Sequence, residues 1–310
     1  MERKCKTGRF FLRCLRGPLI IAVRYTFPHG SLPVRTAMRS FFEYCRCTLF
    51  DFDFDKKEKE AGSRLITIRN METSYPQGKS FRIDEVCFEK GRITSILGRN
   101  GCGKTTLLRT MTGFLPYRGS IEIDGKECRD YTGLERAQKV AYLPQIMKAV
   151  KMNVESLVEH GRFPWHGSFR RMSVSDKNVI ENALEMTHMT SLKARDLTEL
   201  SGGELRRAYL AMVIAQNTEM ILLDEPTTYM DIESQKLFFE IVRTLADRGR
   251  GIVMTCHDIA QSFSLSDIIV LMDRGGVRKT GTPDSLEKYR DDLVQLLGAA
   301  VKRIDDEKLM

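Results

Sequence analysis

The chain has 310 residues, 42% of them hydrophobic and 29% charged, which is ordinary for a soluble globular protein and sufficient for a core without disulfides or metal ions. Its net charge of +8 is uneven, because residues 1–50 carry ten lysines and arginines against two acidic residues, so charge says little about the rest of the chain. No run of about 18 apolar residues occurs, so no transmembrane helix is expected, and no two of the eight cysteines form the Cys-x-x-Cys pair of a zinc or redox site.

Residues 1–62 are expected to be a basic N-terminal extension, to which we assign no fold. They show no sustained helical or strand period, and they end in a charge run, residues 51–60, that is typical of a solvated linker. The apolar stretch Pro18–Val23 is too short to span a membrane and lacks the cleavage site of a secretory signal. Three interpretations stay open: a disordered segment, a segment that binds lipid or nucleic acid, and a start assigned upstream of the true one.

An antiparallel β lobe followed by an α/β core is predicted from Arg64 onward. Short runs of alternating or β-branched residues predict strands. These runs are residues 65–68, 81–83, 93–97, 120–123 and 139–143. A helix should lie among them, from about Lys104 to Gly113.

A helical subdomain is expected to interrupt the core over about residues 147–216. Apolar residues recur there at helical spacing, in residues 174–187 and 205–216. Strand patterns then resume, with helices between them, at residues 220–223, 251–255 and 267–272. Pro283 stands at the first position of another helix, and a helical tail is expected over residues 291–310. The order of elements predicts one α/β cassette over residues 63–290.

A glycine-rich loop joins the predicted strand 93–97 to the predicted helix after it. It reads Gly98-Arg-Asn-Gly-Cys-Gly-Lys-Thr105, the P-loop pattern, whose backbone N–H groups converge on phosphate oxygens beside the positive end of a helix. Lys104 would place its charge on the β- and γ-phosphates, and the Thr105 hydroxyl would bind Mg²⁺. We therefore predict a P-loop NTPase core of the RecA-like type that binds ATP and Mg²⁺. The predicted contacts are Gly98, Arg99, Asn100, Gly101, Cys102, Gly103, Lys104, Thr105 and Thr106.

Two consecutive carboxylates follow the predicted strand 220–223. Asp224 would enter the Mg²⁺ shell, and Glu225 could orient and deprotonate an attacking water. Alone, such a pair would be interpreted as solvated acids at a strand end. Its position downstream of a P-loop favours the catalytic interpretation.

The motif Leu200-Ser-Gly-Gly-Glu204 follows the P-loop along the chain and precedes the Asp224–Glu225 pair. With these three motifs in this order, the chain resembles the ATP-binding subunits of ABC transporters. From the residues alone, Ser201 and Glu204 fit a helix capping box. The resemblance further implies that Ser201, Gly202 and Gly203 contact the γ-phosphate bound on a second cassette. Glu204 stands where the family more often has Gln, and its added charge is expected to lower ATP affinity slightly.

The resemblance covers about residues 64–290. Outside the three motifs, four single residues within this range also match positions of the family. Tyr75 resembles the aromatic residue that stacks on adenine, and Gln145 the glutamine that senses Mg²⁺ and links to the membrane partner. Asp231 resembles the aspartate that crosses the dimer interface, and His257 the histidine that contacts the γ-phosphate. The implied catalytic residues are Glu225, His257 and Lys104, and the implied metal ligands are Thr105, Gln145 and Asp224.

Cys102 occupies a P-loop position where the family often has serine. A thiol beside a helix N-terminus is expected to have a lowered pKa. We therefore predict that Cys102 reacts with thiol reagents and that ATP blocks this reaction.

The pattern of motifs favours an importer over other ABC proteins. Gln145 and Ser201 are only 56 residues apart, without the long coiled coil of chromosome-maintenance and DNA-repair ATPases. A single cassette disfavours translation factors, and the short tail after residue 290 disfavours maltose-type importers. Residues 161–167 and 223–232 resemble the importers of iron siderophores, haem and cobalamin.

The implied function is that of an ATP hydrolase that powers such an importer from the cytoplasmic face of the membrane, as a peripheral subunit. One P-loop and one signature motif on the same chain cannot close on the same ATP, so two cassettes must pair head to tail, as a homodimer. A polytopic permease is the implied partner, a solute-binding protein acts indirectly, and no nucleic acid is expected. The alternative is a soluble ABC ATPase of an assembly system such as iron–sulfur cluster biogenesis.

Overall fold

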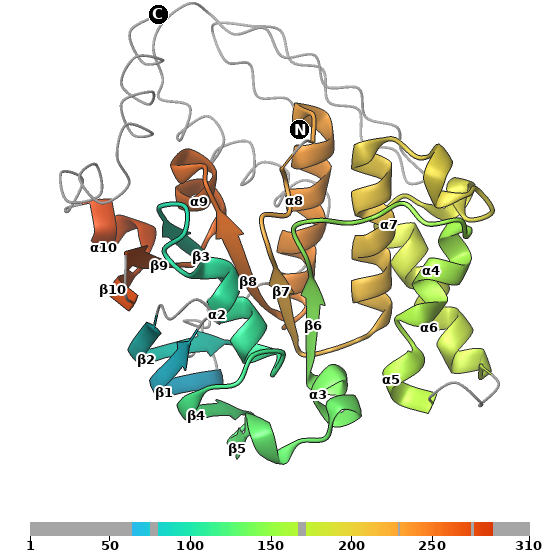
Figure 1. Ribbon diagram of the computed structural model, residues 1–310. Helices are drawn as coiled ribbons and strands as arrows, with labels where there is room; N and C mark the ends of the chain where they lie inside the picture. Colours follow the sequence, from blue (N-terminus) through green and yellow to red (C-terminus); the bar gives the residue numbers. More distant parts are fainter. Residues whose placement is uncertain (1–63, 75–79, 167–171, 229, 274–275, 288–310) are drawn as a thin grey trace, which may run out of the picture. The chain divides into compact units, whose positions relative to one another are not determined.

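A central sheet of six strands carries the fold, in the order β10-β9-β3-β8-β7-β6 (Figure 1). The five strands from β9 to β6 run parallel, and β10 pairs antiparallel with β9. The strands are β3 Ile93–Gly98, β6 Val140–Leu143, β7 Met220–Leu223, β8 Gly251–Cys256, β9 Ile268–Asp273 and β10 Gly276–Gly281.

The computed structural model describes residues 64–74, 80–166, 172–228, 230–273 and 276–287, all within one unit, Lys56–Met310. The proposed extension 1–62, the helical tail 291–310 and Tyr75 lie outside the described residues. No helix in the described ranges is long and apolar enough to cross a membrane.

Both faces of the parallel sheet are buried, which explains why its strands are apolar throughout. In β7, Met220 and Leu222 enter the core on one face, whereas Ile221 and Leu223 enter the core on the other. This division follows from the two-residue period of a strand. It fixes β7 in the middle of the molecule, where its carboxyl end can carry the site.

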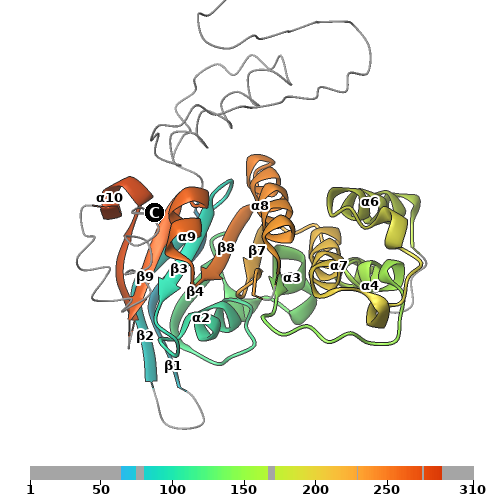
Figure 2. The same ribbon diagram turned by 90° about the horizontal axis from the view of Figure 1, so that it is seen from above.

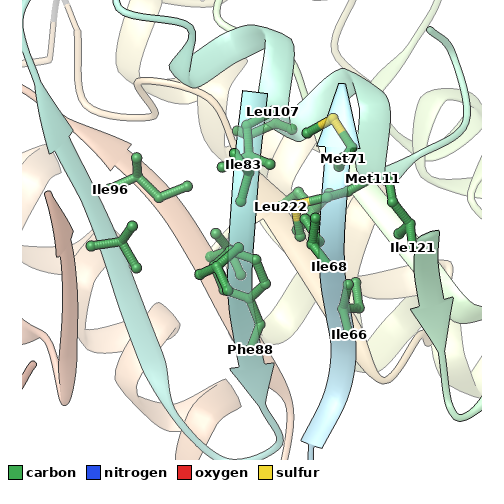
Figure 3. Packing of buried hydrophobic residues seen from close by; sticks show 14 of the residues in the cluster. Ile66, Ile68, Met71, Ile83, Phe88, Ile96, Leu107, Met111, Ile121 and Leu222 are labelled. Carbon is green, nitrogen blue, oxygen red and sulfur yellow. The ribbon is translucent and has the colours of Figure 1, made fainter. Parts of the chain in front are cut away.

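A four-stranded antiparallel sheet, in the order β2-β1-β4-β5, covers the first of these faces together with helix α2. Its strands are β1 Arg64–Ser74, β2 Ser80–Glu89, β4 Arg118–Ile123 and β5 Lys126–Glu127, and α2 is Lys104–Met111. Figure 3 shows Ile66 and Ile68 of β1 in one cluster with Leu107 of α2 and Leu222 of β7. The P-loop helix is thereby held between the two sheets.

Helices α8 Ile232–Asp247 and α9 Ile259–Leu265 cover the opposite face, and Figure 2 shows them on the side of the sheet away from α2. Phe238, Ile241 and Val242 give α8 its buried stripe. Helices α3 Gly133–Lys139 and α10 Pro283–Glu287 lie at the periphery, and short 3-10 turns occupy Cys128–Asp130, Thr190–Leu192 and Leu197–Glu199.

Between β6 and β7 the chain forms a helical subdomain with its own core. It consists of α4 Val154–His160, α5 Phe163–His166, α6 Val174–Met186 and α7 Gly202–Ala215. A buried ion pair fastens it: Arg162 Nε donates to Asp176 Oδ1 at 3.0 Å and Arg162 Nη1 donates to the Ala215 carbonyl at 2.9 Å. The fold class expected from the sequence is confirmed, including the antiparallel lobe and the helical insertion.

Several elements differ from the sequence-based expectation: β1 and β2 are longer than the predicted runs 65–68 and 81–83, and α3 and β5 were not predicted. Helix α7 begins at Gly202, as the predicted capping box at Ser201 requires, three residues before the apolar run 205–216. Strand β6 begins at Val140, since Lys139 is the last residue of α3. Strand β10 was not predicted, because Gly276–Gly281 is a mostly polar edge strand without a clear apolar face.

Candidate functional site

The candidate site lies where the carboxyl ends of β3, β7 and β8 meet. Leu97 of β3 is in register with Cys256 of β8, and Leu223 of β7 with Met254. The residues that follow these strands are the P-loop, the Asp224–Glu225 pair and His257. Ligands bind in this place in open α/β sheets.

The P-loop is shaped by glycines that no other residue could replace. A Cβ atom on Gly98 would lie 2.4 Å from the Met272 carbonyl oxygen. Gly103 has a φ of 111°, and a Cβ there would lie 2.5 Å from the Phe81 ring. The loop therefore presents backbone, and its N–H groups precede the eight-residue helix α2.

Lys104 is held in the same loop, with only 5% of the residue exposed. Its ammonium donates to the Gly98 carbonyl at 2.8 Å and to the Arg99 carbonyl at 3.4 Å. A buried cation in a glycine-rich loop at the start of a helix suits a polyphosphate. The contacts of individual loop residues with ATP stay predictions.

Asp224 is 1% exposed and is surrounded by hydroxyl groups. Thr105 Oγ1 donates to Asp224 Oδ1 at 3.1 Å, Thr255 Oγ1 donates to Oδ1 at 2.9 Å, and the Tyr142 hydroxyl donates to Oδ2 at 3.1 Å. Burial and the charge of Asp224 raise the pKa of Tyr142 to about 12, so this hydroxyl keeps its proton at neutral pH. Hard oxygen donors from Thr105 and Asp224 fit Mg²⁺.

The Glu225 carboxylate contacts two other predicted site residues, Gln145 and His257. Its Oε2 accepts from the Gln145 side-chain amide, and its Oε1 lies against His257 Nε2. Its backbone has a φ of 46°, in the left-handed region, and its N–H donates to Thr255 Oγ1 at 2.7 Å. A pocket opens beside it. The pocket is lined by Glu225, Thr227, Thr228, Gln235, Thr255, Cys256, His257, Asp258 and Gln261.

The signature residues form the capping box that the sequence predicted. Ser201 Oγ accepts from the Glu204 N–H at 3.3 Å, and the Ser201 N–H donates to Glu204 Oε2 at 2.8 Å. These hydrogen bonds lower the pKa of Glu204, so the carboxylate is charged at neutral pH. A Cβ on Gly203 would lie 2.8 Å from Ser234 Oγ, so the start of α7 packs against the start of α8.

Asp231 is the N-cap of α8 rather than a free side chain. Its two oxygens accept from the Ser234 N–H and hydroxyl, each at 2.8 Å, and these contacts lower its pKa. The roles of Ser201, Gly202, Gly203, Glu204 and Asp231 toward a second cassette stay predictions.

The thiol of Cys102 contradicts our expectation. The residue is 3% exposed, and burial raises the pKa of its thiol rather than lowering it. Lys104 acts in the opposite direction, but desolvation of the thiolate is the larger effect. The expected lowering of the thiol pKa was therefore wrong, because the side chain turns toward Gly98, whose added Cβ would lie 2.7 Å from Cys102 Sγ. Slow rather than fast reaction with thiol reagents is now expected.

Three residues of the site were missed from the sequence. Tyr142 and Thr255 lie inside strands, where nothing distinguishes them from other strand residues. Arg206 did leave a signal, since it occupies the buried face of α7 together with Gly203, Leu210 and Val213, and a cation at such a position needs a partner. Arg206 Nη1 donates to the carbonyl oxygens of Glu225 at 3.2 Å and of Pro226 at 2.8 Å.

Comparison with known proteins finds ATP-binding proteins of ABC transporters. The family model for "ABC transporter" matches residues 82–228. The iron(3+)-hydroxamate import ATP-binding protein FhuC of Bacillus subtilis is 36% identical over 213 residues, covering 68% of this chain and 78% of its own. The petrobactin import ATP-binding protein FpuD of Bacillus anthracis is 37% identical over 243 residues, covering 75% and 87%.

Among solved structures, a chain of a metal-chelate type ABC transporter in an inward-facing conformation is similar. It superimposes with a TM-score of 0.65 at 26% identity and covers 75% of this chain and 88% of its own.

Proposed function

The chain belongs to the ABC transporter family of ATP-binding proteins, and from this premise we propose that it hydrolyses ATP to power the import of an iron(III) chelate. Two relatives named for hydroxamate and petrobactin import support the cargo class. The cassette itself contacts nucleotide rather than cargo, so its site supports the ATPase step alone.

One observation carries the catalytic part of the proposal. Glu225 is the second residue after β7, next to Asp224, and its carboxylate is held between Gln145 and His257. A carboxylate fixed on both oxygens has a defined orientation toward the pocket that it lines. It can accept a proton from a water molecule in that pocket.

The other residues bind and orient the nucleotide. The N–H groups of Gly101 to Lys104 and the ammonium of Lys104 would hold the phosphates. Thr105 and Asp224 would hold Mg²⁺, which when bound neutralises charge that develops on the phosphates. Thr255 links the metal side to the catalytic side, because its hydroxyl contacts both Asp224 Oδ1 and the Glu225 N–H.

The active assembly would contain two copies of this cassette and a polytopic permease. Ser201 to Glu204 of one copy would complete the ATP site of the other, and closure of the pair would drive the permease between two states. A solute-binding protein would deliver the chelate, and the cassette would sit as a peripheral subunit on the cytoplasmic face of the membrane.

Substitution of Glu225 by Gln tests the catalytic assignment. The amide cannot accept the proton, so ATP turnover should fall by about 100-fold or more while nucleotide binding persists. Turnover by purified complex and binding of a fluorescent ATP analogue measure the two effects. Wild-type turnover in this variant would show that Glu225 is not the base.

Co-purification from native membranes tests the importer assignment. A polytopic membrane protein should accompany the chain, and ferric chelate with its binding protein should stimulate turnover. Soluble assembly proteins in place of a permease would instead favour the alternative of an iron–sulfur assembly ATPase.

A further inference from the structure

Arg206 connects the helical subdomain to the catalytic strand ends. It lies in the second turn of α7, and only 7% of the residue is exposed. Its guanidinium donates to three backbone carbonyl oxygens outside its own helix: Nη1 to Glu225 at 3.2 Å and Pro226 at 2.8 Å, and Nη2 to Gln145 at 3.3 Å. Arginine suits this task because its planar fork can reach two loops at once.

The two loops that Arg206 joins carry Gln145 and Glu225, whose side chains are hydrogen-bonded to each other. Gln145 follows β6 and Glu225 follows β7, and the Gln145 amide donates to Glu225 Oε2. Arg206 therefore fixes the backbones of a donor and an acceptor whose side chains meet. A shift of the Arg206 guanidinium would therefore move the loop after β6 and the loop after β7 together.

The backbone of Glu225 is held from both sides. Its N–H donates to Thr255 Oγ1 at 2.7 Å, and its carbonyl accepts from Arg206. A φ of 46° is unfavourable for a residue with a Cβ, so outside contacts must maintain it. The same carbonyl of Glu225 accepts from the Thr228 N–H at 3.4 Å, so loss of the Arg206 contact would weaken this restraint rather than abolish it. The backbone could then relax toward the extended region that a residue before proline prefers, and the carboxylate would turn with it.

We infer that Arg206 is a positioning residue, which transmits the placement of the signature helix α7 to the catalytic carboxylate of Glu225 and to Gln145. The same helix is capped by Ser201, five residues before Arg206. Engagement of residues 201–204 by a nucleotide on another cassette would thus act on the carboxylate of its own chain. This inference rests on the proposed function, since it presumes that Glu225 is the catalytic carboxylate.

A buried arginine could instead serve only to hold the helices together, and Arg162 offers a matched control. Arg162 is also 7% exposed and also donates to a backbone carbonyl, that of Ala215, but its partners lie within the helical subdomain. If Arg206 only stabilised the fold, replacing either arginine should lower the melting temperature and leave kcat unchanged.

The test compares R206Q with R162Q in the full-length chain purified with its permease. For R206Q we expect kcat to fall between about 10- and 100-fold with KM for ATP changed less than about threefold, because the base is misplaced but the P-loop is intact. R162Q should keep its kcat, although its melting temperature should fall. R206K should show an intermediate kcat, since an ammonium is a point donor that cannot span both loops.

Three results would overturn the inference: an unchanged kcat in R206Q, an equal loss of kcat in R162Q, or a loss in R206Q that appears wholly in KM. If R206Q fails to fold, R206K carries the test, and a wild-type kcat in R206K then contradicts the inference. Failure of the proposed function is distinguishable, because it would appear as normal turnover in E225Q.

Discussion

The carboxylate of Asp224 is buried, yet each of its oxygens has a hydroxyl partner. Thr105 and Thr255 donate to Oδ1, and Tyr142 donates to Oδ2. Hydrogen bonds of this kind offset the cost of removing an ionised carboxylate from water. The same hydroxyl of Thr105 is the proposed metal ligand, so the protein holds the two oxygen donors together through a direct hydrogen bond.

Cys102 gives a prediction at the residue scale. Burial raises the pKa of its thiol, so at pH 8 little thiolate forms and the sulfur is shielded from reagents. Alkylation by iodoacetamide, followed by peptide mass spectrometry, should be at least about tenfold slower at Cys102 than at Cys87, which is half-buried. Because the pKa of Cys102 is raised, its alkylation rate should still increase at pH values where an ordinary thiol is already fully ionised and its rate no longer changes. Equal labelling of the two cysteines would contradict the buried placement.

At the scale of elements, the sequence predicted best where local chemistry and tertiary structure agree. The P-loop could be recognised because glycine, lysine and threonine at fixed spacing leave one plausible geometry, and Ser201 with Glu204 because a capping box is local. Strand β7 was predictable because both its faces are apolar.

Contacts between distant elements could not be predicted in this way. The bonds from Arg206 go to backbone carbonyls, which every residue possesses, so no residue type marks the acceptor. Tyr142 meets Asp224 only because β6 and β7 are neighbours in the sheet. The burial of Cys102 likewise depends on how the loop folds over Gly98, which a position in a motif does not disclose.

The helical subdomain supports a prediction about acid stability. Hydrogen bonds from Ser173, and then the guanidinium of Arg162, lower the pKa of Asp176 to about 2. A carboxyl with a lowered folded-state pKa contributes stability above its unfolded pKa of about 4 and loses it as the pH falls toward 2. D176N should therefore lower the free energy of unfolding by about 2 kcal/mol at pH 7, with a smaller difference near pH 3.

Urea unfolding followed by circular dichroism at the two pH values measures this effect. E181Q provides the control, because Glu181 is exposed on the same helix α6 and its replacement should change stability by less than about 0.5 kcal/mol. A pH-independent loss in D176N would mean that the ion pair with Arg162 contributes little and that packing alone is disturbed.

At the scale of the whole molecule, the proposed pairing of two cassettes predicts that the protein changes from monomer to dimer in solution when it binds nucleotide. E225Q should form a dimer with ATP and Mg²⁺, because nucleotide is bound and not consumed. Chelation of Mg²⁺ by EDTA should return it to the monomer, and K104A should stay monomeric, since a phosphate contact is lost. Light scattering coupled to gel filtration measures the mass. A dimer of unchanged mass in K104A would show that pairing does not require the P-loop.

The left-handed backbone of Glu225 has a consequence for which residues can replace it. A residue with a side chain in that conformation costs of order 1 kcal/mol, a cost that asparagine largely escapes. Replacement of Glu225 by Asn would relieve this strain but would also remove the carboxylate's contacts with Gln145 and His257, and the chain would be inactive. The backbone strain at Glu225 is therefore tied to the chemistry: the conformation that is unfavourable for a glutamate is the one that holds its carboxylate against Gln145 and His257.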